Sequence, residues 1–291
     1  TMRVKLADVA RVIQGLVTGA DSVFALEEVK AVKCGNVVVK DSNGAEWEIE
    51  RQVLRRFLRG VSVYSFVEPA ANGWLLFPYV LEAGRASLLD ASVLKTQYPK
   101  AWAYLSAYSE VLRRRERGKW DHDEWYAFGR TQNMTQMETP KLVVQVIAPC
   151  ARYALDGEDV YFTGGGNGPY YGLRWSSSDD RRSLAYLQAI LSSRLLDFQL
   201  HNISTTFRGG YYSYGKQFIA QLPIRPIDFS DKSEKAEHDS IVKLVQKITA
   251  AKKNDSNAET AAWEREIDER VYRLYGLTKA EITIVEGETA Q

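Results

Sequence analysis

Residues 37–60, VVVKDSNGAEWEIERQVLRRFLRG, indicate two kinds of secondary structure within one short stretch. The first part predicts a β-hairpin, because Asn43 and Gly44 form a favoured two-residue turn and Trp47 and Ile49 alternate with glutamates on the returning strand. Over the last ten residues the apolar spacing changes to that of a helix, which a glycine ends. This change of period predicts an α+β fold.

The segments on either side extend the same prediction. A glycine-rich GGGNGP segment between two of the strands favours a β-turn over a phosphate loop. Pro99 suits the first turn of a long helix that ends in RRRERGK. The expected strands lie at 11–26 (two short strands around a Thr18-Gly19 turn), 73–80, 141–148, 159–163 and 170–175, and a further helix of about five turns lies at 181–200.

The character of the sequence changes after Pro226. Two apolar stripes at helical spacing flank a polar turn, which predicts a helical hairpin. Gly276 is expected to end the second helix, and Thr278 with Glu281 fits a capping box. We therefore expect a recognition domain at 1–230 and a hairpin at 231–291 that packs on it or on a partner. The stripes consist of Ile241, Leu244, Val245 and Ile248, and of Trp263, Ile267, Val271 and Leu274.

Composition restricts the class of protein. The chain has 291 residues, a formal net charge of +1, 45% hydrophobic and 26% charged residues, which are ordinary values for a protein with a core. Cys34 and Cys150 are far apart and form no CxxC motif, which fits a reducing cytoplasm. We expect no signal peptide and no membrane span. The N-terminus reads as the middle of a pattern, as though it followed a preceding segment.

Motifs of self-sufficient catalysis are absent from the sequence. There is no G-x-G-x-x-G after a strand, no P-loop and no G-x-S-x-G elbow. The acidic cluster at 121–124 with His122 favours a solvated loop over a metal site. Glu28 and Lys30 could mimic half of a nuclease motif, but no partner acid is evident. We therefore expect neither a metal nor a cofactor in this chain.

The order of the segments resembles a known family. KLADVARVIQGLVTGADSVF, LRRFLRG, FPYV, RRRERGKW with WYAFGRTQNM, PKLVVQVIA, AILSSRLLDFQL, GGYYSYGKQFIAQLPI and IDERVYRLYGLTKAEI are similar, in this order, to landmarks of one domain. That domain is the C-terminal target-recognition domain of TaqI-like type II restriction-modification N6-adenine DNA methyltransferases. Type I specificity subunits are similar too. The likeness covers nearly the whole chain, although Arg56 and Ser192 stand where relatives often carry proline and asparagine.

The resemblance implies a mixed β-sheet domain that recognises double-stranded DNA and positions an adenine for a methyltransferase domain or subunit. Relatives carry the catalytic domain, with its Asn-Pro-Pro-Tyr-type motif and S-adenosylmethionine pocket, upstream of this region. This sequence contains neither feature. It therefore resembles a recognition module that is either a part of a methyltransferase or acts beside one, and S-adenosylmethionine is expected in the missing catalytic domain.

Clusters of cations could bind phosphates. Arg51, Arg55 and Arg59 would form one stripe on a helix, and the RRRERGK segment at 113–119 would form a second. A solvated helix face is the alternative for each stripe. Thr18 and Gly19 could offer a hydroxyl and an N–H to phosphate, or could simply make a tight turn.

Amide and guanidinium groups could read bases. Arg130 could bridge guanine, and Gln132 or Asn133 could bridge adenine, although these residues could equally satisfy their own loop. Arg152 follows the 141–148 strand, where relatives tend to place base-reading side chains. In the segment FRGGYYSYGK, two glycines allow close approach to DNA, while tyrosines and cations could contact its backbone. The alternative is that the tyrosines are core or interface rings with polar tips. This segment supplies Arg208, Tyr211 and Lys216.

Together these observations predict a sequence-specific DNA-recognition module of a restriction-modification adenine methyltransferase, either alone or fused to a nuclease. One alternative is an assembly module that docks a methyltransferase or nuclease subunit through the helical hairpin. Another is a self-contained nuclease, which would cut DNA alone with magnesium. The predicted DNA-contacting residues are Thr18, Gly19, Arg55, Arg59, Arg130, Gln132, Asn133, Arg152, Arg208, Tyr211 and Lys216.

Overall fold

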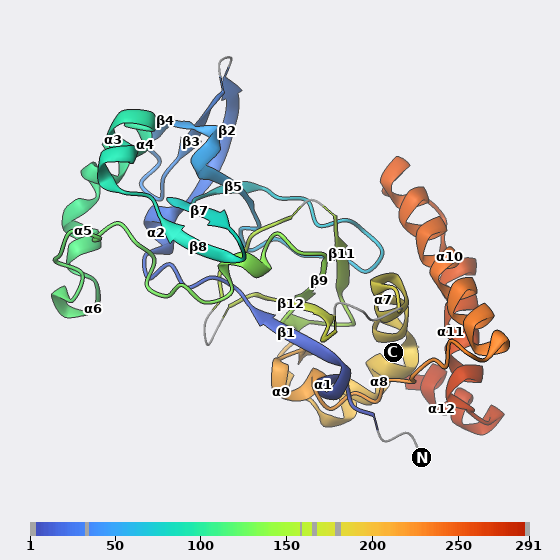
Figure 1. The fold of residues 1–291 in the computed structure, drawn as a ribbon. Helices are drawn as coiled ribbons and strands as arrows, with labels where there is room; N and C mark the ends of the chain where they lie inside the picture. Colours follow the sequence, from blue (N-terminus) through green and yellow to red (C-terminus); the bar gives the residue numbers. More distant parts are fainter. Residues whose placement is uncertain (1–3, 33–34, 158, 165–167, 178–181, 289–291) are drawn as a thin grey trace.

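The computed structural model of the chain describes residues 4–32, 35–157, 159–164, 168–177 and 182–288. A central sheet separates a mostly β-stranded half, which carries α3 to α6 at its edge, from a bundle of C-terminal helices (Figure 1). The α+β class predicted from the sequence is confirmed. Of the expected turn at GGGNGP, residues 165–167 lie outside the described residues, as does Cys34.

The described strands form four separate sheets, with orders β1-β12-β9-β11, β4-β3-β2-β6-β5, β10-β14-β13 and β7-β8. Every ladder between them is antiparallel, and parallel pairing is limited to isolated bridges within the described residues. Their bounds are β1 (Ala10–Gln14), β2 (Ala25–Val32), β3 (Asn36–Lys40), β4 (Glu46–Glu50), β5 (Leu54–Phe57), β6 (Gly73–Leu76), β7 (Tyr79–Glu82), β8 (Arg85–Leu88), β9 (Lys141–Gln145), β10 (Ile147–Ala148), β11 (Tyr153–Asp156), β12 (Tyr170–Trp175), β13 (Thr206–Phe207) and β14 (Tyr211–Ser213).

The helices lie before, between and after these strands. The α-helices are α1 (Leu6–Val9), α2 (Asp21–Phe24), α3 (Ala91–Gln97), α4 (Pro99–Ala107), α5 (Ser109–Arg113), α6 (Arg115–Gly118), α7 (Leu184–Ser192), α8 (Arg194–Ile203), α9 (Lys216–Ile219), α10 (Lys232–Asn254), α11 (Ala261–Tyr275) and α12 (Lys279–Glu288). Short 3-10 helices span η1 (Arg51–Val53) and η2 (Met134–Gln136).

The central sheet β1-β12-β9-β11 is buried on both faces. Along β9, Val143 contributes to the core shared with the N-terminal strands, whereas Leu142 and Val144 contribute to the core shared with the C-terminal helices. On β11, Ala154 and Tyr153 divide between the two cores in the same way. Successive side chains of a strand point to opposite faces, so this one sheet links two hydrophobic cores.

The hairpin predicted at Asn43-Gly44 is confirmed, because β3 and β4 pair antiparallel around this turn and Gly44 has a φ of +81°. The sequence on its N-terminal side behaves differently from the prediction. After β1, Gly19 makes a turn with a φ of +73°, but the short helix α2 then intervenes before β2. The expected strand at 159–163 is present only as isolated bridges at Tyr161 and Thr163.

The helix predicted for residues 51–60 is wrong. The segment forms η1 and then β5, which pairs antiparallel with β6. On its other side β6 pairs with β2, and Gly73 permits that close approach, because a Cβ there would lie 2.5 Å from the Leu26 carbonyl oxygen. The arginines therefore do not form a helical stripe, and the guanidinium groups of Arg51 and Arg56 instead stack on the ring of Trp74.

Both long helices predicted for the middle of the chain are interrupted. Pro99 begins α4 as predicted, but the following residues divide into α4, α5 and α6, and Glu116 and Arg117 have positive φ angles. The helix predicted at 181–200 divides into α7 and α8 at Ser193. The Ser193 hydroxyl accepts a hydrogen bond from the backbone N–H of Leu196 and so caps the start of a new helix.

The C-terminal helical hairpin is confirmed. Helices α10 and α11 pack against each other and against α7 and α8, with Ile241, Val245 and Ile267 in their shared core. Gly276 ends α11 in the left-handed conformation, and Thr278 and Glu281 form the predicted capping box at the start of α12. The hairpin thus covers the chain's own helices, whereas the division at residue 231 stays a prediction. Within the described residues, no helix is both long and apolar enough to cross a bilayer.

Candidate nucleic-acid interface

The predicted contact residues lie in three places on the fold. Two loops, one between β1 and α2 and one before η2, lie side by side and carry the first group. The strand β5 and the residues after it carry the second, and the small sheet β10-β14-β13 with its surroundings carries the third. The groups are Thr18, Gly19, Arg130, Gln132 and Asn133; Arg55 and Arg59; and Arg152, Arg208, Tyr211 and Lys216.

Backbone hydrogen bonds hold the first group together. The N–H of Gly129 donates to the Thr18 carbonyl at 2.8 Å, and the N–H of Arg130 donates to the Val17 carbonyl at 3.0 Å. A Cβ on Gly19 would lie 3.4 Å from the Gly129 Cα, so a glycine with positive φ suits this close approach. The two loops therefore form one continuous surface feature, although they are far apart in sequence.

The Thr18 side chain is buried within this feature. Its hydroxyl donates to the Asp21 carboxylate and accepts from the backbone N–H of Ala20. The carbonyl of Thr18 also accepts a hydrogen bond from Arg115. The hydroxyl is therefore engaged inside the protein, whereas Gly19 is exposed and its backbone lies at the surface. The Thr18 hydroxyl thus serves the turn in this structure, and its contact with a phosphate stays a prediction.

The side chains of the second loop point in different directions. Arg130 is exposed and forms an ion pair with Glu116 at 2.9 Å, and this hydrogen bond lowers the pKa of the Glu116 carboxyl. Gln132 is exposed. Asn133 has a φ of +63° and its side-chain amide donates to the Gln14 carbonyl at 3.1 Å. Arg130 and Gln132 are thus accessible to a ligand, whereas Asn133 satisfies its own loop.

The run of cations at 113–119 is divided by the kinks between α5 and α6. Arg115 is buried, and its guanidinium donates to the carbonyls of Leu112, Thr18, Trp125 and Ala127. Burial lowers the pKa of this guanidinium. The second basic stripe predicted from the sequence therefore loses its central residue, because Arg115 holds three chain segments together instead of facing solvent.

The second group is partly neutralised by acidic neighbours. Arg55 lies 3.1 Å from a carboxylate oxygen of Glu138, and its guanidinium stacks over the ring of Phe77. Arg59 lies 3.8 Å from Glu27. Both arginines are half-buried. They would bind a phosphate only by exchanging a carboxylate for it.

The third group surrounds a β-hairpin made of β13 and β14. Phe207 pairs with Tyr211, and Ile147 of β10 pairs with Ser213, so these side chains share one face of the small sheet. Phe207, Tyr211 and Ile147 are 42–45% exposed. Arg208 is exposed at the tip, next to two glycines with φ angles of +85° and +77°.

The three tyrosines of this segment have three different surroundings. Tyr211 is exposed on the outer face of the hairpin. Tyr212, on the opposite face, stacks on the His201 ring with 3.6 Å between ring centroids. Tyr214 is buried, and its hydroxyl donates to the Asp197 carboxylate, whose pKa burial raises. Core rings are therefore the correct interpretation for Tyr214, and Tyr211 alone of the three has a largely open ring.

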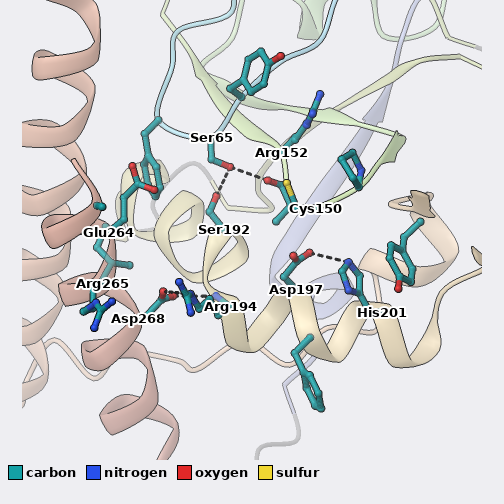
Figure 2. A pocket seen from close by; sticks show the side chains of 18 of the residues that line it. Ser65, Cys150, Arg152, Ser192, Arg194, Asp197, His201, Glu264, Arg265 and Asp268 are labelled. Carbon is teal, nitrogen blue, oxygen red and sulfur yellow. Dashed lines mark hydrogen bonds and ion pairs between the residues drawn. The ribbon is translucent and has the colours of Figure 1, made fainter. Parts of the chain in front are cut away.

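A pocket of about 880 Å³ lies beside the hairpin, between the body and the helix α11 (Figure 2). Arg152 lines its upper part in the view of Figure 2, and the hairpin contributes Gly210 and Tyr212. The helices α8 and α11 supply the lower wall. Ser65 bridges the upper part, donating to the Ala151 carbonyl at 3.2 Å and accepting from Ser192 at 2.8 Å. The pocket thus joins Arg152, a predicted contact residue, to the β13–β14 hairpin.

Several residues of this pocket were not predicted as contacts. Tyr64 is 54% exposed, and the guanidinium of Arg152 stacks 4.7 Å from its ring centroid. Arg194, Lys252 and Arg265 come from the C-terminal helices. Their segments are distant in the sequence, so no local motif connects them. The only signal for the last three was their positive charge, on predicted helices for Arg194 and Arg265 and in the predicted polar turn for Lys252.

No cluster of three or more histidine, cysteine or acidic side chains is arranged for a metal ion within the described ranges. The acidic segment at 121–124 is exposed, and Asp121 pairs with Arg113 at 2.8 Å. Glu28 pairs with Arg56 at 2.9 Å. Asp121 and Glu28 therefore each have a structural partner in the chain.

Comparison with known proteins gives no matching family model. The chain is 25% identical over 283 residues to the type II restriction enzyme and methyltransferase RM.Eco57I of Escherichia coli, which covers 93% of this chain and 28% of that protein. It is 21% identical over 258 residues to the type II methyltransferase M.HindII of Haemophilus influenzae, and this match covers 85% of this chain and 43% of that protein.

A third relative is the type II methyltransferase M.XhoI of Xanthomonas vasicola, which is 25% identical over 189 residues and covers 65% of this chain and 30% of that protein. The chain spans less than half the length of the curated relatives it matches. These matches relate the chain to type II restriction-modification proteins.

Proposed function

We propose that this chain is the part of a type II restriction-modification methyltransferase that recognises its site on double-stranded DNA. The observation that carries the proposal is the match to RM.Eco57I along 93% of the chain. A protein that combines restriction and methylation must direct both activities to one sequence, and a module of this kind would supply that direction. The finer assignment, to a TaqI-like target-recognition domain for adenine methylation, is part of the proposal.

The arrangement of accessible groups supports this role. Recognition of DNA requires cations for phosphates and hydrogen-bonding side chains for base edges. Arg130 and Gln132 project from a loop fixed by backbone bonds, so they can vary their contacts without altering the loop. Arg208 and Tyr211 project from a narrow hairpin whose turn contains two glycines with positive φ. We assign base reading to the first pair and backbone contact to the second.

Catalysis is assigned to a part of the parent protein outside these 291 residues. We propose that a methyltransferase domain or subunit there binds S-adenosylmethionine and acts on an adenine that this chain positions. Enzymes that modify a base turn it out of the helix, so a separate module that holds the flanking duplex would suit the reaction.

The helical hairpin bears on the alternative role in assembly. Its apolar stripes are covered by α7 and α8, and Ile267 is 2% exposed. A partner subunit could not use those stripes without displacing the chain's own helices. An assembly role would therefore need a different surface of α10 or α11.

The test is a binding selection. The chain is mixed with random duplexes at low and near-physiological salt, and the bound fraction is sequenced. We expect one short motif to be enriched at both salt concentrations, while total binding weakens as salt screens the phosphate contacts. Binding without enrichment would overturn sequence recognition, and magnesium-dependent cutting by the chain alone would establish the nuclease alternative.

A further inference from the structure

We propose that the pocket between the body and α11 holds a phosphodiester of the bound duplex, with Arg152 on one wall and Arg265 on the other. This inference rests on the proposed function and extends the DNA-binding surface to a helix that the sequence assigned only to packing. Figure 2 shows the two arginines on different sides of the pocket, one from the segment before β11 and one from α11.

The first step of the argument is the charge balance inside the pocket. Each of its carboxylates already has a partner that lines or borders it. Asp268 pairs with Arg194 at 3.4 Å. Glu264 pairs with Lys252 at 2.8 Å. The third, Asp197, accepts the Tyr214 hydroxyl and lies 3.4 Å from His201. These acidic groups therefore leave the remaining cations of the pocket uncompensated.

The second step concerns the two cations that remain. Arg152 donates to the neutral side-chain oxygen of Gln145 at 3.2 Å and stacks on Tyr64, and its Nε is buried without a hydrogen-bond partner. Arg265 is exposed and forms no ion pair or hydrogen bond with the described part of the chain. Two guanidinium groups without carboxylates, in a pocket large enough for a nucleotide, favour an anionic ligand.

The third step identifies the anion. The DNA-contact hairpin forms part of the same pocket through Gly210 and Tyr212. Arg208 lies at the tip of this hairpin, next to the two glycines, so a duplex that touches Arg208 would lie near the mouth of the pocket. The anionic groups of a duplex are its phosphodiesters. A guanidinium group can donate two parallel hydrogen bonds to phosphate oxygens.

The experiment measures the affinity of the 291-residue chain for a short duplex that contains the selected motif, as a function of salt, by fluorescence anisotropy. R265A is compared with wild type and with R273A, because Arg273 is exposed on the same helix but does not line the pocket. Loss of one phosphate contact lowers the slope of log K against log salt by about 0.9, which corresponds to about fivefold to tenfold weaker binding near 0.1 M salt.

We expect that loss in R265A, wild-type behaviour in R273A, and a slope close to wild type in R265K, which keeps the charge. Equal thermal midpoints would show that the fold is intact. If R265A and R273A both bind as wild type does, the pocket site is refuted while the proposed function stands. If wild type binds no duplex at all, both proposals fall.

Discussion

The guanidinium of Arg115 donates a hydrogen bond to the carbonyl of Thr18 at 2.9 Å, and this contact joins the end of the α4–α6 region to the loop between β1 and α2. Both residues lie in segments that the sequence suggested for phosphate binding. In the fold they bind each other and leave Gly19 and Arg130 at the surface. Thr18, one of the predicted contact residues, therefore helps to position the loops that carry Gly19 and Arg130.

Replacement of Arg115 by alanine should destabilise the protein. The change removes hydrogen bonds to four carbonyls and leaves those acceptors in a buried region, so we expect a loss of about 3 kcal/mol in the free energy of unfolding. Chemical denaturation measures it. R114A is the control, because Arg114 is 78% exposed and pairs only at the surface with Glu110, and it should change stability by about 0.5 kcal/mol or less. Equal losses of unfolding free energy in R115A and R114A would contradict the structural role of Arg115.

The buried pair of Lys141 and Asp156 should show strong coupling. Both side chains are almost fully buried, and Lys141 also donates to the Met137 carbonyl. K141M leaves the Asp156 carboxylate without its cation and should cost about 3–5 kcal/mol. The double variant K141M/D156N should cost clearly less than the sum of the single variants, because it removes both charges. A double-mutant cycle by denaturation checks this, and additivity would contradict the prediction.

Stability should depend on pH through Asp268. Burial raises the pKa of Asp268 to about 6, so the folded state binds a proton more tightly than the unfolded state does. The stabilisation is complete below pH 3.8 and is lost as the pH rises through 6, and it amounts to at most about 3 kcal/mol. D268N should abolish this component. The measurement is the difference in unfolding free energy between wild type and D268N at pH 4.5 and pH 7, and a constant difference would rule the idea out.

Replacement of Arg208 should weaken DNA binding without changing the preferred sequence. Arg208 is exposed at the tip of the β13–β14 hairpin, where we assign it a phosphate. R208A should lower the slope of log K against log salt by about 0.9 and affect all duplexes alike. R85A, an exposed arginine on a different hairpin, serves as the control. A changed motif in R208A would mean that the residue reads bases.

Replacement of Arg130 should instead relax specificity. An arginine that bridges guanine contributes about 1–3 kcal/mol of discrimination at one base pair. R130A should therefore lose preference at a single position of the selected motif and keep the others. E116Q tests the same residue from the other side, because it removes the carboxylate that pairs with Arg130 at 2.9 Å and should strengthen duplex binding. An unchanged motif in R130A would exclude Arg130 from base reading.

Local turn chemistry made some elements predictable from sequence. Asn43-Gly44, Pro99 and Gly276 each act within a few residues, and the hairpin, helix start and helix end that they predict are present. The helix predicted for residues 51–60 was wrong for the opposite reason. Their apolar spacing fits a helix, but pairing with β6, which lies further along the chain, decides the backbone.

The site was less predictable than the fold, for physical reasons. A run of arginines does not reveal which member will meet backbone carbonyls, and Arg115 differs from Arg114 only through its surroundings. The pocket joins Tyr64, Arg152 and Arg265 from segments that meet only in three dimensions. Their positions follow from packing around both cores, which no local pattern encodes.

The central sheet has a consequence for how such a chain could diverge. Successive side chains of β9 and β11 pack into one core or the other, so neither face of these strands is open to solvent, and we expect them to tolerate little change. The loops that carry Arg130 and Arg208 are positioned by backbone bonds and glycines instead. Their exposed side chains can therefore be substituted during evolution without disturbing the loops. Under the proposed function, descendants of one ancestral sequence would thus acquire new target sites through a few replacements while the interior stayed constant.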